Sequence, residues 1–278
     1  MSFELSRLEH RFGWSPNSVA TRNDATGVWV AKKQEIGSTA YSDEQWVAMD
    51  SLLDKSWWYE TRNKIILDAL RRSGIESAIW DIGGGSGVVA KFLINSGFEV
   101  IGVEPSLGGA ELASRRGVHS FSAELSDLRL PTDALDAISM FDVLEHIERR
   151  EEILGEVRRV LRPGGHLILT LPALMMLWSQ FDAEGGHFLR YSRRTIRKEL
   201  VSHGFEVQRD GYFYLLTVLP LFLLRVIPYR LGHRRVVANE TTMSASGGIL
   251  GKMAAAIERL IAMRTPFGSS LLVIARKR

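Results

Sequence analysis

The sequence predicts an α/β fold with a mostly parallel sheet and helices on both of its faces. From residue 57 onward, short apolar runs alternate with amphipathic segments, and strands that alternate with helices pair in parallel through right-handed crossovers. A glycine-rich stretch, residues 81–87 (DIGGGSG), stands between one apolar run and the next amphipathic segment. The 278 residues are long enough to bury a substantial core, and the lack of cysteine excludes disulfides and cysteine-ligated metals.

The first regular element is expected to be a helix from Trp57, because Ile65, Ile66 and Leu70 share one face and Gly74 ends it. Short apolar runs after it predict seven strands: Ala78–Ile82, Glu99–Val103, Val118–Phe121, Leu135–Phe141, His166–Leu171, Phe205–Arg209 and Ser270–Arg276. Amphipathic segments between these runs predict helices over Val88–Ser96, Ala110–Arg116, Glu151–Leu161 and Thr195–His203.

Two segments fall outside this alternation. Residues 1–56 contain scattered aromatics and turn-formers and are expected to be an irregular N-terminal extension or lid. Residues 212–269 separate the last two strands by far more than a hairpin needs, so they predict an apolar helical insertion. The catalytic domain is therefore expected to span residues 57–278.

The insertion holds the longest charge-free apolar run, residues 212–224 (YFYLLTVLPLFLL), followed by several cations and no acid before Glu240. Thirteen helical residues reach only about 20 Å, short of the roughly 30 Å hydrocarbon core, so the run is not expected to span a membrane. Peripheral membrane contact through 212–235, cover for a greasy substrate, and burial in the core or in a homodimer all remain open.

The net charge and the composition of the first twelve residues bear on the expected partners and on the expected location. The net charge is only +3, and basic residues are dispersed apart from 225–235, so nucleic acid is not expected as a partner. Residues 1–12 carry charges and no apolar core, which does not fit a secretory signal. We therefore expect a cytoplasmic protein, with membrane association through the insertion as the alternative.

The glycine stretch and the next strand together predict an adenosine cofactor. Glycines between a strand and a helix allow a tight turn and let a ligand approach the backbone. Glu104 ends the following strand, where its carboxylate can accept hydrogen bonds from both ribose hydroxyls. A dinucleotide loop would need a third glycine at position 88, which is Val88, and the Asp81 carboxylate suits an ammonium better than a pyrophosphate.

With this glycine stretch and Glu104, the chain resembles a class I S-adenosylmethionine-dependent methyltransferase. Residues 140–147 (MFDVLEHI) resemble the segment after the fourth strand in methyltransferases of the ubiquinone and menaquinone type. Residues 161–165 (LRPGG) resemble the helix-to-strand turn before the fifth strand, and residues 269–278 (SSLLVIARKR) resemble the last strand. The resemblance implies a Rossmann-like, seven-stranded, mostly parallel sheet whose last strand is antiparallel.

The resemblance also implies roles for individual residues. S-adenosylmethionine is the implied cofactor, with Glu104 on its ribose and Glu124 near its adenine. Asp127 is the alternative candidate for the adenine contact. No metal ligands are expected. The remaining cofactor contacts are implied for the glycine loop and for the end of the fourth strand: Asp81, Gly83, Gly84, Gly85, Gly87, Met140 and Phe141.

Candidate catalytic residues follow the fourth and fifth strands. On a helix starting near Asp142, that residue, Glu145 and His146 would share one face, and His146 could act as a general base; alternatively, Glu145 and His146 cap the helix. His187 is a second candidate for base or substrate contact, against a role as a loop anchor. Residues expected to line a substrate pocket come from the loop after the fifth strand and from the helix that begins at Trp57, which is expected to cover the cofactor: Trp178, Asp182, Tyr191, Trp58 and Arg62.

The expected function is methyl transfer from S-adenosylmethionine to a small-molecule or lipid-like acceptor, with oxygen as the acceptor atom. Two alternatives remain. One is a relative that binds the cofactor without catalysis, and the other is an NAD(P)-dependent oxidoreductase, against which Val88 argues.

Overall fold

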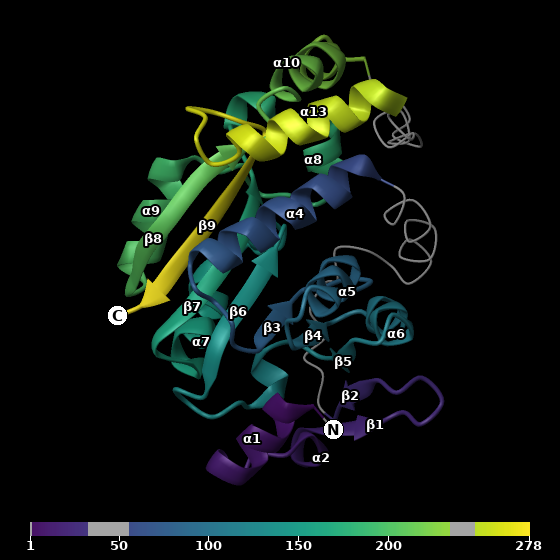
Figure 1. The fold of residues 1–278 in the computed structure, drawn as a ribbon, viewed down its shortest axis with the longest axis vertical. Coiled ribbons are helices and arrows are strands. Elements are labelled where there is room, and N and C mark those ends of the chain that lie inside the picture. Colours follow the sequence, from purple (N-terminus) through teal and green to yellow (C-terminus); the bar gives the residue numbers. More distant parts are fainter. Residues whose placement is uncertain (1, 33–55, 234–247) are drawn as a thin grey trace.

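A computed structural model describes residues 2–32, 56–233 and 248–278, and it contains one mixed sheet of nine strands (Figure 1). The strand order is β1-β2-β5-β4-β3-β6-β7-β9-β8. The strands have the following bounds: β1 Ala20–Arg22, β2 Trp29–Ala31, β3 Ile79–Ile82, β4 Val100–Glu104, β5 His119–Ser122, β6 Leu135–Phe141, β7 Leu161–Pro172, β8 Phe205–Phe213 and β9 Ser270–Lys277.

The seven predicted strands form a Rossmann-like sheet. Strands β5, β4, β3, β6 and β7 pair in parallel, and β9 inserts antiparallel between β7 and β8. This arrangement confirms the predicted fold class and the antiparallel last strand. The parallel strands all end at the same edge of the sheet, so the loops that follow β3, β4 and β6 are brought together there.

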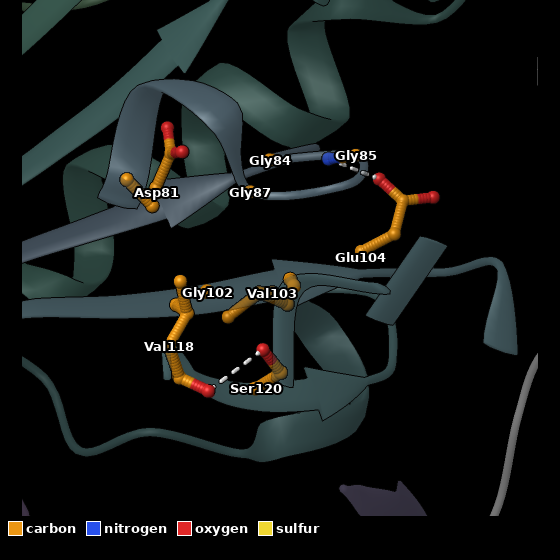
Figure 2. A pocket seen from close by; sticks show the side chains of 11 residues that line it. Asp81, Gly84, Gly85, Gly87, Gly102, Val103, Glu104, Val118 and Ser120 are labelled. Atoms are coloured by element: carbon orange, nitrogen blue, oxygen red, sulfur yellow. Dashed lines mark hydrogen bonds between the residues drawn. The ribbon is translucent and has the colours of Figure 1, made fainter. Parts of the chain in front are cut away.

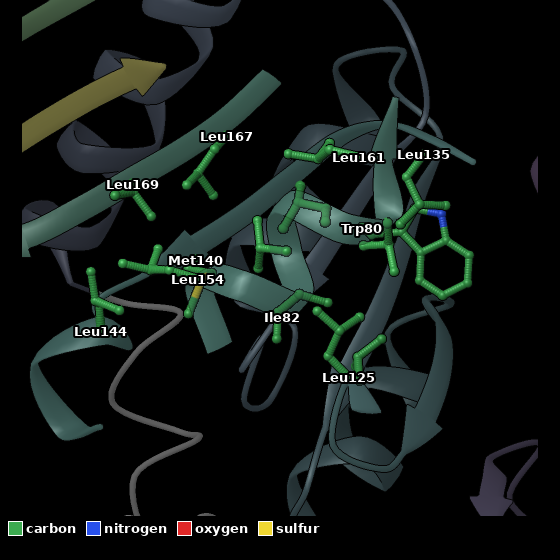
Figure 3. Close-up of a cluster of buried hydrophobic side chains, with 14 of the residues drawn as sticks. Trp80, Ile82, Leu125, Leu135, Met140, Leu144, Leu154, Leu161, Leu167 and Leu169 are labelled. Atoms are coloured by element: carbon green, nitrogen blue, oxygen red, sulfur yellow. The ribbon is translucent and has the colours of Figure 1, made fainter. Parts of the chain in front are cut away.

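Helices cover both faces of this sheet and create two apolar cores. Alternate strand residues point to opposite faces: Trp80 and Ile138 belong to one core, shown in Figure 3, and Ile79 and Ala137 belong to the other. The helices of the parallel region are α4 Trp57–Arg72, α5 Val88–Asn95, α6 Leu107–Arg115, α7 Arg150–Val160 and α9 Arg193–Ser202, with shorter turns η1 Ser126–Leu128, η2 Leu144–His146, η3 Met175–Leu177 and α8 Gln180–Glu184.

The described part of the N-terminal extension is regular, which corrects the expectation of an irregular segment. It forms α1 Phe3–Phe12, α2 Pro16–Val19 and the β1–β2 hairpin, and β2 extends the sheet beside β5. Helix α1 lies at the amino ends of the strands, because the Glu4 amide donates to Glu99 Oε1 (3.0 Å) and Arg7 donates to the Ala134 carbonyl (2.7 Å). Residues 2–32 therefore do not form a lid over the carboxyl ends of the parallel strands. Residues 33–55 lie outside the described ranges.

The insertion before β9 is helical, as predicted, and begins at residue 214 because β8 continues to Phe213. A nearly continuous helix, composed of α10 Val218–Leu221, the π-helical η4 Phe222–Val226 and α11 Ile227–Arg230, follows β8. Helix α13, Gly248–Ile261, packs on α4, and Arg259 forms an ion pair with Asp68. In the described ranges no helix combines the length and apolarity needed to cross a bilayer.

One local expectation was met in part and one was wrong. Residues 161–165 fall within the bounds of β7, but the ladder passes from Leu161 to His166, and residues 162–165 bulge out of it with Gly164 at φ 79°. No helix starts at Asp142. That residue adopts a left-handed conformation (φ 56°), and only a single 3-10 turn, η2, follows it.

Candidate active site

The glycine stretch forms a tight loop between β3 and α5 whose backbone requires glycine. Gly83, Gly85 and Gly87 adopt positive φ values of 70°, 54° and 76°, a region that side chains disfavour. A Cβ on Gly83 would lie 2.7 Å from Val143 Cγ2, and one on Gly87 would lie 2.7 Å from Ala113 Cβ. The loop is therefore pressed against α6 and against the segment after β6.

Glu104 ties the loop to the end of β4, as Figure 2 shows. Its Oε2 accepts a hydrogen bond from the Gly85 amide (2.9 Å), and its Oε1 accepts one from the Ser106 amide (3.0 Å). The side chain is buried at the end of β4, next to the loop. A carboxylate at this place is suited to accept hydrogen bonds from a diol placed over the loop.

Asp81 lies under the loop near the end of β3 and is 1% exposed. Its Oδ1 accepts a hydrogen bond from Ser139 Oγ (2.7 Å), and a Cβ on Gly84 would approach its Oδ2 to 2.9 Å. Burial raises the pKa of Asp81 to about 6, although the Ser139 hydrogen bond opposes the rise. A cationic ligand group nearby would compensate for this buried charge.

A small pocket is lined by these residues. It brings together five of the predicted cofactor residues, which are Asp81, Gly84, Gly85, Gly87 and Glu104. Small side chains complete its lining: Ala90, Gly102, Val103, Ala113, Val118 and Ser120. Glycines whose Cβ atoms would collide, a carboxylate at a strand end and a buried acid are the groups expected around the ribose and ammonium of S-adenosylmethionine.

Four predicted cofactor residues lie outside this pocket lining. One of them, Gly83, belongs to the glycine loop itself. Met140 is fully buried in the core of Figure 3, and Phe141 is buried in the core on the opposite face. Glu124 follows β5 and is half-buried, while its rival Asp127 accepts a hydrogen bond from the Glu124 amide (3.0 Å). The Asp127 carboxylate therefore holds the turn after β5, and adenine contact through Glu124 stays a prediction.

The segment after β6 places three candidate residues beside the glycine loop. The Asp142 carboxylate pairs with the buried guanidinium of Arg62 from α4, and Glu145 is buried in η2. Burial and the charge of Asp142 raise the pKa of Glu145 well above its ordinary range. Burial and the neighbouring His187 lower the pKa of His146 to about 4, so its imidazole is neutral at pH 7.

His187 belongs to a buried network after β7. Its Nδ1 lies 3.0 Å from Oδ1 of Asp182, which also accepts a hydrogen bond from Arg190 Nε (2.7 Å). Although burial raises the pKa of Asp182, the hydrogen bond from His187 and the charge of Arg190 hold it below its ordinary value. The rings of His146 and His187 meet edge to face with centroids 4.5 Å apart, so the two histidine candidates lie together.

The predicted substrate residues are half-buried in the case of the two tryptophans and buried in the case of the other three. Trp58 is half-buried on α4, where it stacks on Tyr214 with centroids 4.9 Å apart, and Arg62 lies over its ring. Trp178 is also half-buried. Asp182 and Tyr191 are fully buried, so they position neighbouring groups rather than line an open pocket.

Two residues of this site escaped the sequence analysis. Ser139 pairs with Asp81 across β3 and β6, and Tyr214 supports Trp58 by donating a hydrogen bond to its carbonyl. A serine at the centre of the apolar run 135–141 was the signal for the first. Tyr214 stands within the long apolar run of the insertion, where nothing marked it as a partner of α4.

Comparisons with known proteins agree with this geometry. Residues 60–209 match the family described as a methyltransferase domain. A methyltransferase of Mycobacterium avium is 31% identical over 144 residues, which cover 48% of this chain and 56% of that protein. Demethylmenaquinone methyltransferase of Mycobacterium tuberculosis is 26% identical over 154 residues, which cover 55% and 58% of the two chains.

The similarity in fold extends further than the similarity in sequence. A crystal structure from Thermotoga maritima, described as an S-adenosylmethionine-dependent methyltransferase and possible histamine N-methyltransferase, superimposes with a TM-score of 0.57 at 17% identity. The match covers 84% of this chain and 95% of that one. This chain spans about half the length of the curated relatives it matches.

Proposed function

Because this chain belongs to the methyltransferase domain family, we propose that it transfers a methyl group from S-adenosylmethionine to an oxygen atom of a small, lipid-like acceptor. The cofactor supplies a methyl carbon already activated by its sulfonium. The protein must therefore bind the cofactor, align the acceptor and assist loss of the acceptor's proton. Family membership favours this function over a nicotinamide-dependent oxidoreductase.

The observation that carries the proposal is the Glu104–Gly85 contact above the buried Asp81. Glu104 is expected to bind the ribose hydroxyls, and Asp81 with Gly83, Gly84 and Gly87 is expected to surround the methionyl end. Titration calorimetry with S-adenosylhomocysteine and with NAD tests this assignment. We expect one equivalent of S-adenosylhomocysteine to bind and NAD to give no heat. Absence of binding by the former would overturn the proposal.

The residues beside the glycine loop support an oxygen acceptor. His146 and His187 lie together after β6 and β7, and an imidazole nitrogen can accept the proton of a hydroxyl. Asp142 instead pairs with Arg62, so we assign it to holding α4 against the loop. Initial rates with lipid, quinone and sugar alcohols test the acceptor class. Cofactor binding with no turnover on any of them would favour a non-catalytic relative.

An exposed apolar surface on the insertion supports a lipid-like acceptor. Leu219, Leu223, Ile227 and Leu231 recur every four residues, a spacing that puts them on one helical face, and we call them the leucine stripe. Leu219 is 64% exposed and Leu231 is 68% exposed. Helix α13, which lies beside α10 in Figure 1, adds the exposed residues Met253, Ile257 and Leu260. Such a surface, with Arg225 and Arg230 on the same helix, suits the interface of an anionic bilayer.

Vesicle sedimentation tests membrane contact. The full chain is expected to sediment with phosphatidylglycerol-containing vesicles and to remain in solution with phosphatidylcholine vesicles. The double variant Leu219→Asp/Leu223→Asp should lose binding. Phe3→Asp is a matched control, because Phe3 is 78% exposed on α1 at the other end of the molecule. Failure to bind, together with a dimer in sedimentation velocity that the double variant abolishes, would assign the stripe to a second subunit.

A further inference from the structure

Three side chains converge between η2 and the loop before α9. Glu145, His146 and His187 each offer one ligand atom, and these atoms all lie within 4.8 Å of one another. Bonds of about 2.0–2.2 Å from zinc to nitrogen or oxygen place the ligand atoms of a tetrahedral site roughly 3.4 Å apart. Small side-chain rotations would therefore bring all three atoms onto one cation.

Glu145 has an unsatisfied acceptor that points to a missing ligand. The residue is 1% exposed, and its buried Oε2 has no hydrogen-bond partner among the described residues. A buried carboxylate oxygen without a partner costs free energy, on the order of 1–3 kcal/mol. A bound cation would satisfy this oxygen and offset the cost of burying the charge.

His187 is oriented as a metal-binding histidine would be. The Asp182 carboxylate is buried and ionised, so the proton on the His187 ring belongs on Nδ1, which donates to Oδ1 of Asp182. The lone pair is then on Nε2, on the other side of the ring. A carboxylate behind a histidine ligand is the arrangement that fixes the tautomer and orientation at many metal sites.

The charges around the cluster favour a cation. Arg62 pairs with Asp142, and Arg190 pairs with Asp182. Glu145, the third carboxylate, forms no ion pair in the part of the chain that the structure describes. Each of the two arginines is thus matched by another carboxylate, which leaves the Glu145 side chain to face a bound cation.

We propose that Glu145, His146 and His187 bind one divalent transition-metal cation, with Zn²⁺, Co²⁺ and Mn²⁺ as candidates. Two imidazoles and one carboxylate leave a coordination position open, as in catalytic zinc sites. The cluster adjoins the glycine loop through Val143. The inference rests on the proposed function in one respect, because it gives the open position to the acceptor hydroxyl. A cation there would lower the pKa of the hydroxyl, whose proton would pass to water and leave an alkoxide to accept the methyl group. With the cation bound, the two imidazoles serve as ligands instead of as proton acceptors.

Cobalt binding to the full chain tests the site directly. The protein is prepared without a histidine tag, dialysed against EDTA, saturated with S-adenosylhomocysteine and titrated with Co²⁺ alone. We expect one equivalent to bind with visible d–d absorption. Glu145→Gln and His187→Asn should each weaken binding at least 10-fold. His119→Asn should not, because His119 begins β5 at the opposite edge of the sheet.

The titration separates this inference from the proposed function. S-adenosylhomocysteine affinity, measured in the same samples, reports whether each variant is folded. Normal S-adenosylhomocysteine binding without Co²⁺ binding, or Co²⁺ binding that both variants retain, would overturn the metal site and leave the methyltransferase proposal intact. Co²⁺ binding that depends on Glu145 and His187 without any S-adenosylhomocysteine binding would support the site and overturn the proposed function.

Discussion

Replacing Asp81 with asparagine should make the protein more stable and a weaker cofactor binder. Asp81 is 1% exposed, and burial raises its pKa from 3.8 to about 6. Ionisation is therefore harder in the folded chain than in the unfolded one. The contribution of this group to the free energy of unfolding is fully present below about pH 4 and is lost as the pH rises to about 6.

The size of the effect follows from that difference in pKa. A change from 3.8 to about 6 corresponds to about 3 kcal/mol at pH 7. Asparagine keeps an oxygen that can accept the Ser139 hydrogen bond and removes the buried charge. Urea denaturation of Asp81→Asn without cofactor should thus show a gain of up to about 3 kcal/mol at pH 7 and a smaller gain at pH 5.

The same substitution should weaken S-adenosylhomocysteine binding by about 1–3 kcal/mol, or roughly 5- to 150-fold in Kd, because the ammonium loses its counter-charge. Asp68→Asn is a suitable control: the hydrogen bond from Arg259 lowers the pKa of Asp68, so its loss should reduce stability slightly. An Asp81→Asn variant that is less stable at pH 7, or that binds the ligand as tightly as the wild type, would refute the reasoning.

Three further substitutions test the frame of the site. Glu104→Gln should weaken S-adenosylhomocysteine binding by about 1–3 kcal/mol, because its amide can no longer accept from both Gly85 and Ser106; unchanged affinity by calorimetry would mean that the loop is misassigned. Gly87→Ala should lower the free energy of unfolding, measured in urea, by about 1–3 kcal/mol. The new Cβ would collide with Ala113, and residue 87 has a positive φ that alanine disfavours. Wild-type stability would contradict the packing of the loop. Tyr214→Phe removes the hydrogen bond to the Trp58 carbonyl and should cost about 1 kcal/mol of stability, with no loss expected if α4 is held by packing alone.

The cofactor half of the site was predictable because its signals are local. Alternating apolar and amphipathic segments predicted the seven strands in order, and the positions of Asp81 and Glu104 at strand ends placed both carboxylates at one edge. The antiparallel β9 came from the resemblance to known methyltransferases, and the strand order was not predicted, since periodicity alone does not determine which strands pair.

The rest depends on contacts between residues far apart in the chain. Asp142 is left-handed rather than helical, and its partner Arg62 lies 80 residues earlier. His146 and His187 are also widely separated, and only the packing of η2 against the loop before α9 brings their rings together. The helix α1 was missed because its contacts are with residues much later in the chain: Glu4 and Arg7 bond to residues just before β4 and β6, and its leucines join a core built on those strands.

The central claim is tested most directly by a crystal structure of the full chain with S-adenosylhomocysteine. We expect the ribose hydroxyls within hydrogen-bond distance of Glu104 and the ammonium beside Asp81, over the loop from Gly83 to Gly87. Density for the ligand at another place, or a loop that stays empty at saturating ligand, would contradict the assignment of this chain as an S-adenosylmethionine-dependent methyltransferase.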